Sequence, residues 1–499
     1  MRSRPAESGT PPWLLPAIGA LLLLNAASQL LVSGTADQDQ AEQLLLSQGW
    51  ALGYGAQPPL YTYLVKLLFQ VTGVALWPLL LLKAVLLGLL VLAVVRIGEE
   101  LALRRDQQLL ALSGLALIPQ FIWEAQRDLT HSVLATTLAA FTLLQLLRLA
   151  RRPGVGGFVG LGALVAGGML SKYSFVLFVA SLLITALTIP ALRRTLLRPA
   201  LALSLITALL LLAPHLAWVL QHSDQAVRGL EKTRSLGPLN PAGAAAGLTS
   251  AALTAIAFLS PFWLVALAVL WPDRRRLHRA DPQLQPGQAL LQRLPLVLLG
   301  LLVVFVLATG ATRFKDRWYQ CLLFHAPLSV ATLAPPLRGR RLQAMVGAGL
   351  VAASTSALLL PGRTLLAGLT GQDNRPSHPL PELVAGLGAR HGAPQRILAS
   401  SGSIGGSARL VFPTVPIHTP RALERGGAPP AAAGERVLVL IDRDDDPAEL
   451  QALAAAVLGP GFDPAGLPGQ LRELSLPERH GPQRRYPIRY AWIVARGGS

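Results

Sequence analysis

Charged side chains that flank or interrupt the long apolar runs of this chain are the first candidates for chemistry. Placing a charge at membrane depth is costly, so such residues usually serve a function. A carboxylate can take a proton from a hydroxyl group, and fixed cations can hold a phosphate as its charge grows during bond cleavage. Together they would suit a reaction between a phosphate-bearing lipid and an acceptor that needs a base. The candidates form four groups: Asp37 and Asp39; Arg127, Asp128 and His131; Lys172; and Arg313, Lys315, Asp316 and Arg317.

Each group also has a structural explanation. Asp37 and Asp39 would cap a helix and meet its positive dipole, and Arg127 would pair with Asp128 at a tight turn. Lys172 would extend from a helix end towards the interface, and the 313–317 cluster would bind lipid head groups. His131 is more often a packing residue than a metal ligand, since no second ligand is suitably spaced. The sequence alone leaves these alternatives open.

The elements that must position these groups are membrane-spanning helices. Of the 499 residues, 52% are hydrophobic and 14% are charged, whereas soluble domains carry roughly 25% charged residues. Runs of about 20 apolar residues, enough to cross a bilayer as helix, recur along the chain. We therefore predict a mainly α, polytopic transmembrane bundle of about eleven helices over residues 1–361. The predicted spans are 13–33, 76–96, 108–124, 129–149, 155–171, 173–190, 199–220, 250–271, 294–311, 318–336 and 343–361.

Arginine clusters predict the orientation of these spans. The net charge of +18 comes from short basic clusters between apolar runs, so we interpret it as loop charge rather than as a nucleic-acid surface. All clusters fall on one side of the membrane if the N-terminus is cytoplasmic, and the four polar groups then fall on the other. The clusters are Arg2 and Arg4; Arg104 and Arg105; Arg151 and Arg152; Arg193, Arg194 and Arg198; Arg274, Arg275, Arg276 and Arg279; and Arg338, Arg340 and Arg341.

Two further regions lie on the predicted outer side. The first outer loop, 34–75, contains helical patterns at 39–48 and 60–71 that would lie at the membrane surface. The tail 362–499 is richer in Pro, Gly and charge, and it predicts a small extramembrane α/β domain. Its expected strands are 396–399, 436–441 and 487–495, and its expected helices are 380–390 and 447–458. The glycine-rich stretch 401–406 does not match a nucleotide-binding pattern and is expected to be an ordinary loop.

Four stretches, in chain order, carry a family resemblance. The first stretch is Asp-Gln-Asp-Gln-Ala-Glu-Gln from residue 37 with Gly-Trp-Ala-Leu-Gly-Tyr-Gly-Ala-Gln-Pro-Pro-Leu-Tyr-Thr-Tyr-Leu from residue 49. The second is Trp-Glu-Ala-Gln-Arg-Asp-Leu-Thr-His-Ser-Val-Leu from residue 123, and the third is Gly-Gly-Met-Leu-Ser-Lys-Tyr from residue 167. The fourth is Arg-Trp-Tyr-Gln from residue 317 with Ala-Pro-Leu from residue 326. Over roughly 13–335 the chain resembles the bacterial dolichyl-phosphate-mannose–protein mannosyltransferase-like family of the GT-C class, which includes the lipid A aminoarabinose transferases.

The resemblance implies an inverting glycosyltransferase in the bacterial inner membrane. It would move a sugar from a polyprenyl-phosphate carrier to a lipid, glycan or protein acceptor at the periplasmic face, where the C-terminal domain would also lie. Asp39 would be the catalytic base, with Asp37 as the alternative; Arg127, Lys172 and Arg313 or Arg317 would hold the lipid phosphate, and Asp128 would orient one cation or the acceptor. The substrate-binding residues implied by the matching motifs are Gln57, Tyr61, Arg127, Asp128, His131, Lys172, Tyr173, Arg313, Arg317 and Tyr319.

The chain departs from the family pattern in the first outer loop. Gln40 replaces the family's Glu, and Ala56 and Gln57 replace the acid and Lys that precede Pro-Pro in the aminoarabinose transferases. The sequence assigns no metal-binding residues and no certain cofactor, and the use of a divalent metal ion is left as an open alternative. The main rival interpretation is a non-enzymatic lipid or polysaccharide transporter, which would usually show internal repeats. A second rival, a polysaccharide ligase or polymerase, would have a long outer loop late in the membrane region, whereas in this chain the long outer loop follows the first span.

Overall fold

A computed structural model describes residues 9–225, 241–274, 284–425, 427–459 and 462–495. The chain divides into two compact units. The first comprises Met1–Leu23, Ala56–Tyr61 and Lys83–Ala357, and the second comprises Leu24–Gly55, Thr62–Leu82 and Leu358–Ser499. The predicted tail 362–499 therefore lies wholly in the second unit, which also takes in most of the first outer loop.

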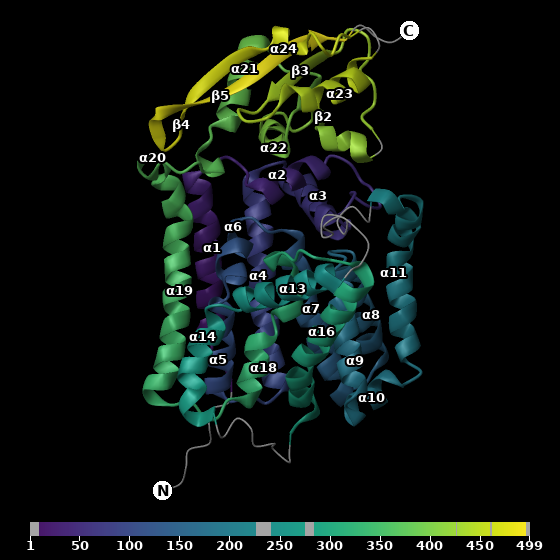
Figure 1. The fold of residues 1–499 in the computed structure, drawn as a ribbon, viewed down its shortest axis with the longest axis vertical. Coiled ribbons are helices and arrows are strands. Elements are labelled where there is room, and N and C mark those ends of the chain that lie inside the picture. The colour runs from purple at the N-terminus through teal and green to yellow at the C-terminus, as the bar shows by residue number, and fades with distance from the viewer. Residues whose placement is uncertain (1–8, 226–240, 275–283, 426, 460–461, 496–499) are drawn as a thin grey trace. The chain divides into compact units, whose positions relative to one another are not determined.

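The described part of the first unit is built from helices and their connections (Figure 1). Four helices run from one unit into the other: α1 (Leu14–Val32), α3 (Leu60–Thr72), α4 (Leu76–Glu100) and α19 (Gly339–Leu365). The remaining α-helices of the first unit are α5 (Arg105–Ala116), α6 (Ala125–Arg127), α7 (His131–Arg151), α8 (Val155–Met169), α9 (Phe175–Leu187), α10 (Pro190–Leu196), α11 (Leu201–Gln221), α13 (Pro241–Phe258), α14 (Phe262–Leu270), α16 (Pro286–Thr309), α17 (Gln320–Leu323) and α18 (Ala326–Leu333).

These helices make the chain a multi-pass membrane protein. Within the described residues, seven helices are long and apolar enough to span a membrane, or up to nine if each bent helix pair counts as one span. Every predicted span falls on helix, but the count of eleven is not confirmed. The predicted span 108–124 bends by 68° between α5 and the helical turns at 120–127, and 173–190 is followed by a 117° bend into α10. The span 250–271 is broken between α13 and α14 at Pro261.

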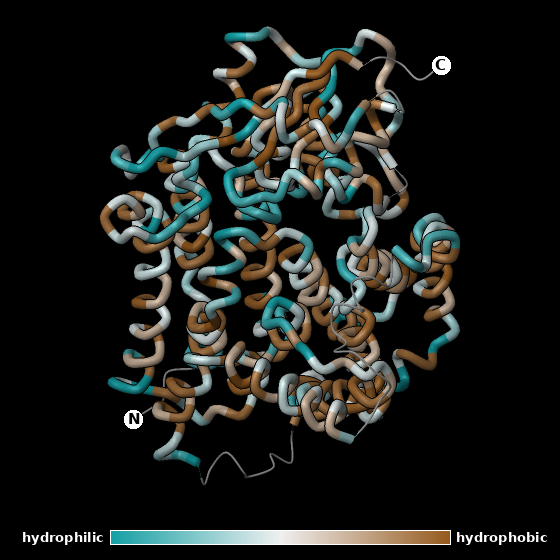
Figure 2. The backbone as a smooth tube through the Cα atoms, turned by 45° about the horizontal axis from the view of Figure 1, so that its top comes forward, coloured by the Kyte–Doolittle hydropathy of each residue, from teal (hydrophilic) through white to brown (hydrophobic). Residues whose placement is uncertain are grey.

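One end of the first unit gathers described arginines of the clusters identified in the sequence. Arg148 and Arg151 at the end of α7 both pair with Glu100 at the end of α4, at 3.3 and 3.4 Å. Asp106 at the start of α5 accepts a hydrogen bond from the backbone N–H of Leu337 at 2.8 Å. Arg341 pairs with Asp273 at 2.5 Å. In Figure 2 hydrophobic colouring dominates the helices of this unit, and hydrophilic colouring collects at turns between them.

The second unit contains the outer-loop helices α2 (Gln38–Leu46) and α3 (Leu60–Thr72), the latter beginning in the first unit. Both confirm the helical patterns expected at 39–48 and 60–71. A five-stranded sheet follows in the order β2-β1-β3-β5-β4. The strands are β1 (Arg396–Ala399), β2 (Ile417–His418), β3 (Arg436–Ile441), β4 (Arg472–Glu478) and β5 (Gly481–Val494). β2, β1 and β3 are parallel, and β5 pairs antiparallel with both β3 and β4.

Helices cover both faces of this sheet. The helices are α20 (Ala367–Thr370), α21 (Leu380–His391), α22 (Gly402–Val411), α23 (Pro447–Leu458) and α24 (Leu467–Gln470). Leu438 and Leu440 of β3 pack with α21 and α22. The alternating residues Val437, Val439 and Ile441 pack with α23, so β3 is a continuous apolar run as expected of a strand buried on both sides. The predicted strands 396–399 and 436–441 and helix 447–458 are confirmed, whereas the expected loop at 401–406 is wrong because it opens α22.

Candidate active site

The acidic pair of the first outer loop opens helix α2. Asp37 is the N-cap: its carboxylate accepts the backbone N–H of Gln38 at 3.3 Å, and Gln40 completes a capping box by accepting the N–H of Asp37 at 3.2 Å. Asp37 is buried and Asp39 is half-buried in the first helical turn. The structural explanation for Asp37 as a helix cap therefore holds, whereas Asp39 lies inside the first turn of α2.

The C-terminal part of the second unit holds this capped turn in place. Arg363 donates to the Asp37 carboxylate at 3.3 Å. Thr35 donates to the carbonyl of His378 at 2.6 Å, and Ser33 donates to the carbonyl of Pro376 at 2.7 Å. Sequence reasoning missed these partners because they lie more than 300 positions away along the chain, and no local pattern marks them.

Helix α22 packs directly on α2. A Cβ atom at Gly406 would lie 2.7 Å from the Cβ of Ala41, and one at Gly405 would lie 3.4 Å from Leu45 Cδ1. Only glycine leaves room for so close an approach of the two backbones. The glycines of 401–406, which do not form a phosphate loop, instead allow the C-terminal domain to contact the helix that carries Asp39.

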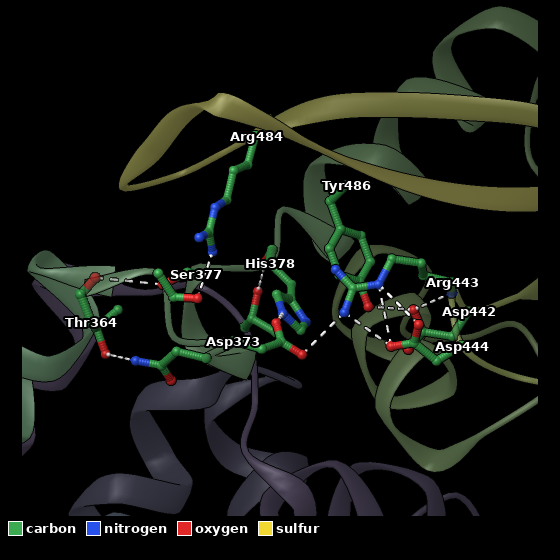
Figure 3. A network of polar contacts seen from close by, with 12 residues as sticks. Thr364, Asp373, Ser377, His378, Asp442, Arg443, Asp444, Arg484 and Tyr486 are labelled. Atoms are coloured by element: carbon green, nitrogen blue, oxygen red, sulfur yellow. Dashed lines mark hydrogen bonds and ion pairs between the residues drawn. The ribbon is translucent and has the colours of Figure 1, made fainter. Parts of the chain in front are cut away.

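A polar network ties the connection before α21 to the strand ends of the sheet (Figure 3). His378 bonds to Asp373 at 2.6 Å, and Arg443 pairs with the other oxygen of Asp373 at 3.0 Å. The Tyr486 ring stacks 4.1 Å from the His378 ring, and its hydroxyl donates to Asp442 at 2.6 Å. Burial alone would raise the pKa of Asp373, but its bonds to His378 and Arg443 outweigh that effect and lower it. The network thereby holds His378, whose carbonyl anchors Thr35.

In the first unit, Lys172 joins three of the segments singled out in the sequence. Its Nζ donates to Ser132 Oγ at 2.6 Å and to the backbone carbonyl of Arg317 at 2.9 Å. His131, beside Ser132, lies within electrostatic range of Lys172. The structure thus brings together the segments around 131, 172 and 317, as the predicted one-sided arrangement requires.

The end of the Pro-Pro segment lies against the same turn. The backbone N–H of Leu60 donates to the carbonyl of Leu170 at 3.0 Å. The Tyr61 ring is buried, with its centroid 5.4 Å from that of His131. Gln57 is half-buried three residues before Leu60. Of the residues expected to contact substrate, Tyr61 and His131 therefore lie beside the Lys172 turn.

The other candidates have more local partners. Arg127 pairs with Glu124, three residues earlier, at 2.8 Å. Asp128 is buried at the end of α6. Asp316 accepts a hydrogen bond from Gln120 and another from the N–H of Arg317 at 2.8 Å.

Three aromatic and basic candidates lie further along the same segments. Tyr173 stacks on His215 of α11, with ring centroids 5.8 Å apart. Tyr319 is fully buried and donates to the carbonyl of Ala251 at 2.8 Å, which identifies it as a packing residue. Arg313 is exposed. In the part of the chain that the structure describes, no three His, Cys, Asp or Glu side chains are grouped as a metal site.

Comparisons with known proteins agree with this architecture. Residues 56–218 match the family described as dolichyl-phosphate-mannose-protein mannosyltransferase. The chain is 30% identical to the lipopolysaccharide core galacturonosyltransferase RgtB of Rhizobium johnstonii, over 96% of this chain and 97% of that protein. It is 28% identical to RgtA, a lipopolysaccharide core galacturonosyltransferase of the same organism, over 95% and 96% of the two chains.

A solved structure shares the fold. The crystal structure of ArnT from Cupriavidus metallidurans bound to undecaprenyl phosphate superposes with a TM-score of 0.59 at 13% identity, covering 98% of this chain and 99% of that one. The arabinofuranosyltransferase AftD from mycobacteria matches with a TM-score of 0.51 over 99% of this chain and 40% of its own. At these identities the likeness concerns the fold.

Proposed function

Because the chain belongs to the GT-C membrane glycosyltransferases of the dolichyl-phosphate-mannose–protein mannosyltransferase type, we propose that it transfers a sugar from a polyprenyl-phosphate carrier to an envelope glycan with inversion at the anomeric carbon. Full-length relatives are named as lipopolysaccharide core galacturonosyltransferases. A fold neighbour was solved with undecaprenyl phosphate bound. The proposed donor sugar is accordingly galacturonate, and the proposed acceptor is a lipopolysaccharide core.

The observation that carries this proposal is the position of Lys172. Two hydrogen bonds, to Ser132 and to the Arg317 carbonyl, hold its ammonium group where three polar segments meet. A cation fixed before the reaction stabilises a leaving phosphate without reorganising during bond cleavage. We assign Lys172 to the phosphate of the lipid carrier, with Arg127 and Arg317 of the matching motifs as further basic candidates.

Asp39 is assigned as the catalytic base. Its carboxylate would accept the proton of the acceptor hydroxyl while that oxygen bonds to the anomeric carbon and the bond from this carbon to the phosphate oxygen breaks. The lipid phosphate leaves with the bonding electron pair, and the sugar inverts in one displacement. Asp37 is assigned a positioning role, because its oxygens are engaged by the α2 N-terminus and by Arg363.

The reaction is proposed to occur at the periplasmic face of the bacterial inner membrane. Lys172 binds Ser132 at the start of α7, whereas the basic residues Arg148 and Arg151 lie in the last turn of the same helix, and positive residues favour the cytoplasm. An impermeant maleimide should therefore label Gln372→Cys but not Arg152→Cys in intact spheroplasts, both positions being exposed. Labelling of Arg152→Cys alone would show that the chain has the opposite orientation in the membrane.

Transfer in proteoliposomes tests the activity. Wild type should move labelled galacturonate from polyprenyl-phosphate galacturonate to lipopolysaccharide core, and Asp39→Asn should lower kcat by roughly 10²- to 10⁴-fold. Arg152→Gln, an exposed change at the basic end of α7, is the matched control and should retain full rate. Absence of transfer from every polyprenyl-phosphate sugar would contradict the donor class, and full activity of Asp39→Asn would contradict the base.

A further inference from the structure

Two basic side chains in the second unit lie near one another without a carboxylate partner. Lys66 of α3 donates to the backbone carbonyl of Gln48 at 3.0 Å. Arg409 of α22 is half-buried, and its Nε is buried without a hydrogen-bond partner in the described part of the chain. Burial first, and then repulsion from Arg409, lowers the pKa of Lys66. Among the described residues no ion pair neutralises either cation.

The packing around α2 explains why the two cations approach each other. Thr62, one turn before Lys66 on α3, donates to Gln43 of α2 at 2.9 Å, so this face of α3 is turned towards α2. Arg409 follows Gly406 and Gly405 by three and four residues, so it lies on the face of α22 that packs on α2. Lys66 of α3 and Arg409 of α22 thus come from two helices that both pack on the short helix α2.

An exposed aromatic ring completes this group. Trp50 is 52% exposed, and Lys66 Nζ lies 5.1 Å from its ring centroid. Tyr63 supports the same ring from the side, with centroids 5.2 Å apart, and its own hydroxyl is held by the carbonyl of Ala51 at 2.7 Å. Gln48 is in turn held by both backbone groups of Ile417, at 2.9 and 3.0 Å. The ring and the ammonium group are therefore held in place before any ligand arrives.

We propose that Lys66, Arg409 and the ring of Trp50 bind an anionic group, a phosphate or a carboxylate, of the glycan acceptor. Two neighbouring, partly desolvated cations repel each other, and an anion between them replaces that repulsion with two charge-assisted hydrogen bonds. The proposal rests on the glycosyl transfer proposed above and adds that the acceptor is recognised by its negative charge.

Acceptor kinetics give the first test. In phosphatidylcholine proteoliposomes, Lys66→Gln and Arg409→Gln should each raise the KM for lipopolysaccharide about tenfold, with kcat and the KM for the donor unchanged. Arg409→Lys keeps the positive charge, so its acceptor KM should lie between those of wild type and Arg409→Gln. Misfolding caused by the loss of the arginine would not give this partial recovery. Arg390→Gln, an exposed arginine of α21 in the same unit, is the matched control. An acceptor KM that stays at the wild-type value in both Gln variants would overturn the proposal.

Binding without turnover separates this site from the proposed function. Lipopolysaccharide should change the tryptophan fluorescence of the wild-type chain, and the change should be absent from Trp50→Phe and strongly reduced in Lys66→Gln. This result would support the site even if no transfer were detected. An equal response to phosphatidylglycerol vesicles would identify a bulk lipid head group as the ligand and overturn the assignment to an acceptor.

Discussion

Substitutions at Asp37 separate helix capping from catalysis. Asp37→Ala removes the N-cap of α2, which costs about 1 kcal/mol, and the charge-assisted bond to Arg363, which costs a further 1–2 kcal/mol or so. That bond is largely shielded, because only 8% of the Asp37 side chain is exposed. Since 1.4 kcal/mol is a factor of ten, the two losses together should increase opening of α2 roughly 30- to 150-fold. Asp37→Asn keeps a good cap and should lose only the second part.

The measurement pairs hydrogen exchange with transfer rate. Amide exchange in the peptide covering 38–46 should be fastest in Asp37→Ala, intermediate in Asp37→Asn and near wild type in Asp39→Asn. The order of kcat should differ: Asp39→Asn should be the slowest by far, while Asp37→Asn should stay within about tenfold of wild type. If Asp37→Asn abolished transfer while its α2 exchanged like wild type, Asp37 would be the base and the reasoning from the cap would be refuted.

Three further predictions concern other parts of the chain. Lys172→Met should lower kcat by roughly 10²- to 10³-fold in the proteoliposome assay, because the leaving phosphate loses a fixed cation; an unchanged kcat would remove Lys172 from the site. Gly168→Ala should destabilise the chain by about 1–3 kcal/mol in thermal unfolding, because the new Cβ would overlap the Phe175 ring, whereas Gly167→Ala makes only ordinary contacts and is its control. The hydrogen bond from Arg396 outweighs burial and lowers the pKa of Glu435 below its ordinary 4.5. The difference in unfolding free energy between wild type and Arg396→Gln should therefore be largest at neutral pH and shrink as the pH falls below 4.5. A difference that is independent of pH down to about 2 would contradict this.

Local patterns predicted much of the fold. The helices at 38–46 and 60–72, the strands at 396–399 and 436–441 and the helix at 447–458 follow from helical spacing or from short apolar runs. β2 and β4 were missed. β2 has only two residues, and β4 mixes polar and apolar side chains without strict alternation. The loop expected at 401–406 is wrong because these residues open α22, where the close approach to Ala41 requires glycine at 406.

The candidate site was predicted only in part, because its contacts join segments that are far apart in the sequence. The grouping of the segments around His131, Lys172 and Arg317 agrees with the alternating helix direction that the arginine clusters predict. The partners of the candidates, such as Ser132 for Lys172 and Arg363 for Asp37, depend on contacts between distant segments. Uncharged serine in an apolar helix and an arginine near a helix end carry no sequence signal that would single them out.

The order in which the ribosome delivers the second unit has a consequence for biosynthesis. Asp37 and Asp39 are synthesised early, whereas Arg363 at the end of α19, His378 and helix α22, which hold the start of α2 in place, are synthesised more than 300 residues later. An isolated helix of nine residues is marginal in water, so α2 should stay largely unformed while the nascent chain is incomplete. A chain that stops before α22 would expose its proposed base without the contacts that orient it. Translation to the end of the chain would thus control when the enzyme becomes competent.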